Sequence, residues 1–160
     1  MALIHYITQI QLDFGAVRQL AAECQRTGMR KPLVVSDAGV RAAGVLDHAL
    51  EALGAMPHAV YDQTPSNPTE AAVRQAVALL RAERCDGLVA VGGGSSIDLA
   101  KGAAIAAVYP GPLKTYATIE GGSPKIGAEV LPLIAVPTTA ASSASTAGTW
   151  CRRRRSATPS

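Results

Sequence analysis

Short runs of aliphatic residues alternate with longer segments of helical periodicity along most of this sequence. A short apolar run that contains β-branched residues is typical of a strand buried on both faces, and such strands separated by helices indicate right-handed βαβ units. The sequence therefore predicts an α/β fold, in which helices cover both faces of a doubly wound parallel sheet. The predicted strands are 32–36, 57–61, 88–91 and 131–136, with a further extended segment at 3–14, and the predicted helices are 15–26, 40–53, 70–84 and 95–108.

Three consecutive glycines, Gly92, Gly93 and Gly94, lie between the third of these strands and the helix that follows it. Glycine lets the backbone approach a phosphate closely, and the free N–H groups and dipole at the start of a helix attract an anion. The stretch is not a Rossmann G-x-G-x-x-G fingerprint, because Ile97 stands where the third glycine is needed, and no Gly-Lys-Ser/Thr follows for a Walker A loop. A tight turn without a ligand is the alternative, but three glycines in succession are costly for a turn alone. The sequence therefore predicts a phosphate-binding turn and a nucleotide-binding domain.

Charged and polar residues next to the predicted strands and helices are candidates for binding or capping. Asp37 comes directly after the first strand, where a carboxylate accepts hydrogen bonds either from a ribose 2′-hydroxyl or from the start of the next helix, and the sequence leaves both readings open. Asp98 and Lys101 are three positions apart on one helix, a spacing that favours an ion pair. Thr69 or Asn67 is expected to cap the helix that begins near residue 70.

Composition argues against several classes of protein. Aromatic residues make up only 4% of the chain, too few for an aromatic platform that binds single-stranded nucleic acid. Four of the 15 basic residues are arginines 152–155, which leaves 11 basic against 12 acidic residues elsewhere and no basic nucleic-acid face. No apolar run reaches the roughly 18 residues of a membrane span, and no signal peptide is recognisable, so a cytoplasmic protein is expected. The cysteines and histidines have no disulfide or metal-ligand spacing, and the cysteines are expected to be small buried hydrophobes.

Three motifs, taken in their order and spacing, resemble the iron-containing (group III) alcohol dehydrogenase family. The resemblance covers roughly residues 1–140 and corresponds to the family's N-terminal cofactor domain, whose Rossmann-like sheet is shared with dehydroquinate synthase-like enzymes. The motifs are Asp62 with Pro65-Ser66-Asn67-Pro68-Thr69, then Val89-Ala90-Val91-Gly92-Gly93-Gly94-Ser95-Ser96-Ile97-Asp98-Leu99-Ala100-Lys101, then Ile134-Ala135-Val136-Pro137-Thr138-Thr139-Ala140.

The resemblance implies a function and a set of binding residues. Members of the family transfer hydride between a nicotinamide dinucleotide, NAD or NADP, and an alcohol, aldehyde or keto group, with Fe²⁺ or another divalent metal that polarises the substrate oxygen. The glycine turn would hold the pyrophosphate through Gly93, Gly94, Ser95 and Ser96. Asp37 would contact the adenosine ribose and favour NAD, and Asp98 would face the nicotinamide side. Thr138 and Thr139 would line the adenine and phosphate side, and Asn67 would lie near the cofactor cleft. The cofactor-binding residues implied in this way are Asp37, Asn67, Gly93, Gly94, Ser95, Ser96, Asp98, Thr138 and Thr139.

The sequence departs from the family's pattern after residue 140. Where members continue with Gly-Thr-Gly-Ser-Glu, this chain has Ala141-Ser142-Ser143-Ala144-Ser145, and residues 141–160 contain no Leu, Ile, Val, Met, Phe, Asp or Glu. Such a segment buries too little surface to offset its ordering entropy, so we expect residues 141–160 to be disordered. Its arginine run is typical of a GC-rich frame read out of register, which suggests a truncated or frameshifted gene; a natural short protein with a basic tail is the alternative. The family's metal ligands, an Asp and three His of a later all-helical domain, are then absent, so we assign no catalytic or metal-binding residue and expect no alcohol dehydrogenase activity.

One function is favoured and two alternatives remain. The favoured one is the cofactor-binding portion, at residues 1–140, of an NAD(P)-dependent oxidoreductase of small alcohols or aldehydes, and a homo-oligomer is compatible with it. The second is a stand-alone nucleotide-binding or interaction module with a basic tail. The third stays within the fold, as a glycerol dehydrogenase-like or maleylacetate reductase-like fragment, although the Asn-Pro-Thr and Pro-Thr-Thr-Ala motifs favour the alcohol dehydrogenase branch.

Overall fold

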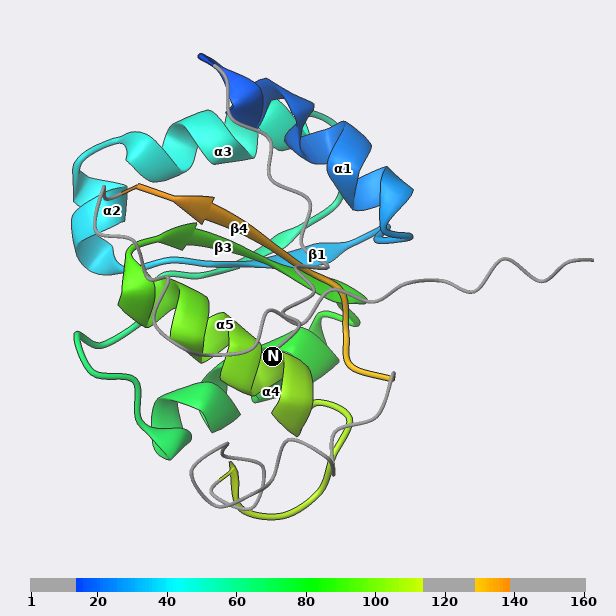
Figure 1. Ribbon diagram of the computed structural model, residues 1–160, viewed down its shortest axis with the longest axis vertical. Coiled ribbons are helices and arrows are strands. Elements are labelled where there is room, and N and C mark those ends of the chain that lie inside the picture. The colour runs from blue at the N-terminus through cyan, green and yellow to red at the C-terminus, as the bar shows by residue number, and fades with distance from the viewer. Residues whose placement is uncertain (1–13, 114–128, 139–160) are drawn as a thin grey trace, which may run out of the picture.

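The computed structural model describes residues 14–113 and 129–138, which form a parallel sheet with helices on both faces (Figure 1). Within these residues the strands run in the order β2-β1-β3-β4, and each neighbouring pair is parallel. The predicted α/β class with a parallel sheet is therefore confirmed. The strands are β1 (Pro32–Val35), β2 (Ala59–Tyr61), β3 (Gly87–Gly92) and β4 (Leu133–Pro137).

Helices form the two outer layers of the domain. Helices α1 and α3 pack on one face of the sheet, and α4 and α5 pack on the other (Figure 1). A short 3-10 helix, η1, precedes α1, and the short α2 leads from β1 into α3. The helices are η1 (Ala16–Gln19), α1 (Leu20–Arg26), α2 (Ala38–Ala42), α3 (Val45–Leu53), α4 (Glu70–Ala82) and α5 (Gly94–Ala106).

Side chains of the central strand β3 alternate between the two layers. Leu88 and Ala90 pack with α4 and α5, whereas Val89 and Val91 pack with α1 and α3. All four side chains are fully buried. A parallel strand covered on both faces needs apolar residues at consecutive positions, and this is why β3 is an uninterrupted apolar run in the sequence.

Asp86 joins the amino ends of β1 and β3. Its Oδ2 accepts a hydrogen bond from the N–H of Arg30 at 2.8 Å, and its Oδ1 accepts one from the N–H of Lys31 at 3.0 Å. The N–H of Asp86 donates in return to the carbonyl of Lys31 at 3.0 Å. These bonds fix the register in which Pro32 lies opposite Gly87.

Replacing Asp86 by alanine is expected to lower the free energy of unfolding by about 2 kcal/mol, because two charge-assisted hydrogen bonds to backbone amides are lost. Urea denaturation of the two proteins measures the difference. The control is Glu51→Ala on the exposed side of α3, which should change stability by no more than about 0.5 kcal/mol. Equal effects of the two substitutions would contradict the role given to Asp86.

The prediction of one continuous helix over 40–53 is wrong, because the structure has two helices in this region, α2 and α3. Helix α2 begins earlier than predicted, at Ala38, since the carboxylate of Asp37 accepts the N–H of Val40 at 2.9 Å and caps the helix. Gly44 then adopts a φ of +73° and breaks the chain before α3. Glycine takes this left-handed conformation with little strain, and the apolar periodicity that continues across the break conceals it.

The predicted helix 70–84 becomes α4, and both of its ends have a clear cause. Thr69 is the residue that caps it, because its hydroxyl accepts the N–H of Ala72 at 3.2 Å. The helix ends at Ala82, and Arg84 just beyond it has a φ of +55°, which no α-helix contains. Of the two alternatives for the cap, the structure therefore selects Thr69.

The remaining boundaries differ by a few residues. The predicted helix 15–26 begins as a 3-10 turn, the predicted helix 95–108 is α5, and the predicted strand 57–61 shortens to the three residues of β2 that pair with β1. The extended segment predicted at 3–14 falls almost wholly outside the described residues, as does the tail at 141–160. No helix among the described residues is long and apolar enough to cross a membrane.

Two of the cysteines lie in the core as small hydrophobic residues. Cys24 and Cys85 are buried and unpaired, as predicted, and Cys151 lies outside the described residues. Burial, with smaller contributions from the nearby carboxylates of Asp86 and Glu23, raises the pKa of the Cys24 thiol to about 11. Burial also raises the pKa of Cys85, so both thiols are protonated at neutral pH and are poor nucleophiles.

Candidate functional site

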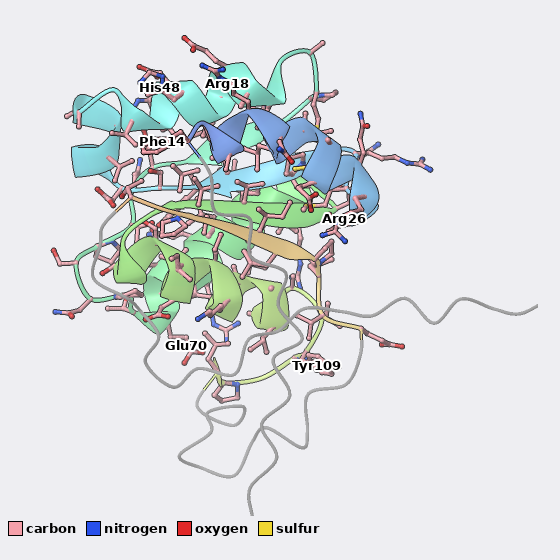
Figure 2. All side chains as sticks on the ribbon, turned by 45° about the horizontal axis from the view of Figure 1, so that its top comes forward. Phe14, Arg18, Arg26, His48, Glu70 and Tyr109 are labelled. Atoms are coloured by element: carbon pink, nitrogen blue, oxygen red, sulfur yellow. The ribbon has the colours of Figure 1, made fainter. Side chains whose placement is uncertain are left out.

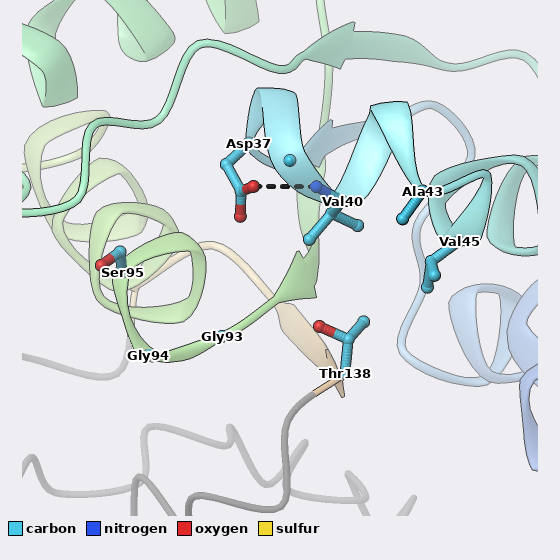
Figure 3. Close-up of a pocket in the computed structure, with 9 residues that line it drawn as sticks. Asp37, Val40, Ala43, Val45, Gly93, Gly94, Ser95 and Thr138 are labelled. Atoms are coloured by element: carbon cyan, nitrogen blue, oxygen red, sulfur yellow. Dashed lines mark hydrogen bonds between the residues drawn. The ribbon is translucent and has the colours of Figure 1, made fainter.

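A pocket of about 430 Å³ opens at the edge of the sheet where β1, β3 and β4 end (Figure 3). Strand β1 continues into α2 and α3 toward one layer, whereas its neighbour β3 continues into α5 in the opposite layer. In a doubly wound sheet, this divergence of neighbouring strands leaves a crevice in which ligands bind. The residues that line the pocket are Asp37, Gly39, Val40, Ala43, Val45, Gly93, Gly94, Ser95 and Thr138.

The glycine turn and the start of α5 line this pocket with Gly93, Gly94 and Ser95. Gly93 is the N-cap residue of α5 and has no side chain to cap the helix. The first hydrogen bond of the helix joins the N–H of Ile97 to the carbonyl of Gly93 at 3.2 Å. The amides of Gly94 and Ser95, which line the pocket, therefore precede the helical ladder and can donate to a ligand. Because α5 is 13 residues long, its dipole adds to the attraction for an anion such as phosphate.

The turn depends on glycine at position 92. Gly92 has a φ of +151°, and a Cβ atom there would lie 2.6 Å from Oγ of Ser96 and 3.3 Å from Oδ2 of Asp37. The carbonyl of Gly92 accepts the N–H of Thr138 at 3.0 Å. The missing side chain thus allows the ends of β1, β3 and β4 to approach one another closely.

Asp37 lies across the pocket from the glycine turn, and both of its carboxylate oxygens have partners. Oδ1 accepts the N–H of Val40 at 2.9 Å, and Oδ2 accepts the hydroxyl of Ser96 at 3.2 Å (Figure 3 draws the first of these). The capping role that the sequence left open is confirmed. A carboxylate has about four lone-pair sites, so acceptor capacity remains for a ribose, and that role stays a prediction.

The loop that precedes α4 is tied to the glycine turn. The hydroxyl of Ser95 donates a hydrogen bond to the carbonyl of Ser66, which brings the neighbouring, exposed Asn67 to this side of the molecule. The same loop buries Thr64, whose N–H donates to the carbonyl of Ser36 at 3.3 Å. Among the described residues, Oγ1 of Thr64 has no hydrogen-bond partner.

Three of the predicted binding residues that the structure describes do not line the pocket: Asn67, Ser96 and Asp98. Asp98 is 58% exposed and forms the predicted ion pair with Lys101, at 3.7 Å between Oδ1 and Nζ. Ser96 is fully buried in the first turn of α5, whereas Thr139 lies outside the described residues. The roles assigned to these residues and to Asn67 in cofactor binding stay predictions.

The sequence prediction missed the apolar wall of the pocket. Val40 and Ala43 lie about one turn apart at the α2 segment, and Val45 begins α3. Together they present aliphatic surface beside Asp37 (Figure 3), suited to a flat ring. The spacing of Val40 and Ala43 directly after a strand-end aspartate is the one signal in the sequence that could have indicated this wall.

The described residues contain no group of three His, Cys, Asp or Glu side chains that could hold a metal ion. His48 projects from the outer surface of α3 (Figure 2). His58 donates its Nδ1–H to the carbonyl of Met56 at 2.9 Å.

The pocket at the switch point of the sheet belongs to a doubly wound α/β domain, with the start of α5 and Asp37 in its lining. Comparison with known families places it more narrowly. Residues 8–151 match the family model described as iron-containing alcohol dehydrogenase, and the chain belongs to this family. The resemblance noted in the sequence is thereby confirmed.

Individual relatives agree with this assignment. The chain is 63% identical over 139 residues to 4-hydroxybutyrate dehydrogenase of Cupriavidus necator, a match that covers 87% of this chain and 36% of the relative. It is 38% identical over 130 residues to 1,3-propanediol dehydrogenase of Klebsiella pneumoniae, covering 79% and 33%. Among solved structures, NADH-dependent butanol dehydrogenase A of Thermotoga maritima matches with a TM-score of 0.75 and 26% identity, covering 86% of this chain and 34% of that one. The chain spans about a third of the length of the relatives it matches.

Proposed function

We propose that this chain binds NAD or NADH in the pocket at the carboxyl ends of β1, β3 and β4, as the cofactor-binding portion of an iron-containing-type dehydrogenase. The observation that carries the proposal is the start of α5, where the amides of Gly94 and Ser95 have no partner among the described residues and both residues line the same pocket as Asp37 and an apolar wall. An anionic group, a sugar diol and a flat ring are the three chemical parts of an adenosine diphosphate. Each of them has a matching surface in the pocket.

Each part of the nucleotide has an assigned position in this proposal. The pyrophosphate accepts hydrogen bonds from the amides of Gly94 and Ser95, and the helix dipole of α5 stabilises its charge. The adenosine ribose donates its hydroxyl groups to the free lone pairs of Asp37. The adenine ring lies on the aliphatic surface of Val40 and Ala43, and Thr138 lies at the far side of the pocket.

The reaction of the whole protein is a further part of the proposal. The nicotinamide cofactor supplies the hydride chemistry, and this chain contributes the pocket that holds and orients the adenosine half. The 63% identity to a 4-hydroxybutyrate dehydrogenase supports a small hydroxy acid as the substrate class. A solved relative, sulfoacetaldehyde reductase of Bifidobacterium kashiwanohense, was crystallised in complex with NAD+ and matches with a TM-score of 0.67 and 25% identity. It supports a nicotinamide dinucleotide as the ligand.

Calorimetric titration of the full chain tests the proposal. We expect ADP-ribose and NAD+ to bind with similar affinity, and adenosine to bind at least about tenfold more weakly, because it lacks the pyrophosphate that the α5 amides bind. Absence of binding of NAD+ and ADP-ribose at millimolar concentration would overturn the proposal. Equal affinity for adenosine and ADP-ribose would overturn the role of the glycine turn.

A further inference from the structure

The buried hydroxyl of Ser96 joins the two halves of the proposed nucleotide site. Ser96 belongs to the glycine turn and Asp37 follows β1, 59 positions away, yet Oγ of Ser96 lies 3.2 Å from Oδ2 of Asp37. Ser96 is fully buried and does not line the pocket. A side chain in this position acts on a ligand through Asp37 and not by direct contact.

The chemistry of the contact sets its direction. A serine hydroxyl carries one proton, and a carboxylate only accepts, so the proton of Ser96 is donated to Asp37 and is not offered to a phosphate. The position is also sterically defined, because a Cβ on Gly92 would lie 2.6 Å from Oγ of Ser96 and 3.3 Å from Oδ2 of Asp37. The glycine therefore provides the space in which hydroxyl and carboxylate meet.

Two donors on separate elements fix the orientation of the Asp37 carboxylate. The N–H of Val40 holds Oδ1 from α2, and Ser96 holds Oδ2 from α5. The terminal torsion of aspartate is otherwise broad, so removal of either donor lets the carboxylate rotate. Fixed in this way, the carboxylate keeps its remaining lone pairs toward the pocket, where a ribose diol gains two acceptors and a 2′-phosphate meets a fixed negative charge.

We propose that Ser96 is a positioning residue that orients Asp37 and thereby sets the preference of the site for a nucleotide with a free 2′-hydroxyl over one with a 2′-phosphate. The inference rests on the proposed function. It adds Ser96 as a residue that affects selectivity. The role of Ser96 differs from that of Ser95, whose hydroxyl donates to the carbonyl of Ser66.

Binding of ADP-ribose and of its 2′-phosphate to the full chain measures this selectivity. In the Ser96→Ala variant we expect the preference for ADP-ribose to fall about three- to tenfold. One hydrogen bond to the carboxylate is lost, and only part of its free energy affects the selectivity. Ser96→Cys, with a weaker donor of similar size, is expected to give an intermediate preference.

Ser36→Ala is the matched control. Ser36 is also fully buried and donates its hydroxyl to a backbone carbonyl, that of Val91 at 2.8 Å, but it makes no bond to the Asp37 carboxylate. It should lose comparable stability and keep the preference for ADP-ribose. In an Asp37→Asn background, which retains a capping side chain, Ser96→Ala should change the preference no further.

The outcomes separate this inference from the function on which it rests. If the wild-type chain binds ADP-ribose but Ser96→Ala keeps the same preference as Ser36→Ala, the positioning role is refuted and the proposed function stands. The positioning role is also refuted, and the proposed function stands, if Ser96→Ala lowers the preference by the same factor in the wild-type and Asp37→Asn backgrounds. If the wild-type chain binds neither probe, the proposed function fails and this inference fails with it.

Discussion

Replacing Gly92 by alanine is expected to lower the free energy of unfolding by about 3 to 5 kcal/mol. This loss is the sum of backbone strain at residue 92 and of steric overlap between the new methyl group and Ser96. The φ of +151° at this residue is one that side-chain-bearing residues rarely adopt, and the new methyl group would lie 2.6 Å from Oγ and 2.9 Å from Cβ of Ser96. Ser96 is fully buried, so it can move away only if its neighbours move as well. Such a loss is a large part of the stability of an ordinary domain, so we expect a much lower melting temperature.

The control for Gly92→Ala is Gly44→Ala. Gly44 also has a positive φ, of +73°, but a Cβ atom built there meets nothing within 4 Å. Its replacement by alanine should therefore carry backbone strain alone, about 1 to 2 kcal/mol. Denaturant titration of both variants compares the two. If they lose the same stability, the contact with Ser96 is not what requires glycine at position 92.

Replacing Gly94 by aspartate is expected to weaken binding of ADP-ribose by at least about 100-fold, because a carboxylate beside a pyrophosphate adds several kcal/mol of repulsion at an effective dielectric constant near 20. Gly94 is the first residue of α5 and lines the pocket. An acidic residue in the first turn of a helix is favourable for the helix itself. The variant should therefore keep or slightly raise its melting temperature while it loses the ligand, which separates binding from folding.

Gly94→Asn is the matched control, since asparagine has the shape of aspartate without its charge. We expect it to weaken ADP-ribose binding by less than about tenfold, and we expect the gap between the two variants to narrow as salt screens the repulsion. Titration calorimetry at low and high ionic strength measures both effects. Equal losses for aspartate and asparagine would mean that the side chain blocks the pocket sterically and that the α5 amides are not an anion site.

The fold could be predicted from the sequence because burial on both faces leaves a direct trace in it. Val89 and Val91 pack on one layer while Leu88 and Ala90 pack on the other, so the central strand has no polar position to interrupt the apolar run. Turn residues between such runs then separate strands from helices. The same reasoning failed at Gly44, since two short helices joined by one left-handed glycine preserve the apolar spacing of a single long helix.

Local parts of the candidate site could be predicted, but its long-range contacts could not. The glycine turn and the strand-end Asp37 are recognisable because each depends on neighbours in the sequence. The bond from Ser96 to Asp37 and the bond from Ser95 to Ser66 join segments 59 and 29 positions apart. Nothing in either segment alone specifies such a pairing, which depends on the order of strands in the sheet.

The walls of the pocket come from three separate parts of the chain, at residues 37–45, at residues 93–95 and at Thr138. Since Thr138 follows β4, the pocket is complete only when the last of the four described strands has paired with β3. A bound nucleotide would then stabilise the assembled sheet as a unit, by an amount that rises with the logarithm of its concentration. Nucleotide affinity is for this reason a sensitive reporter of folding, because a nascent or partly unfolded chain that has not docked β4 lacks one side of the site.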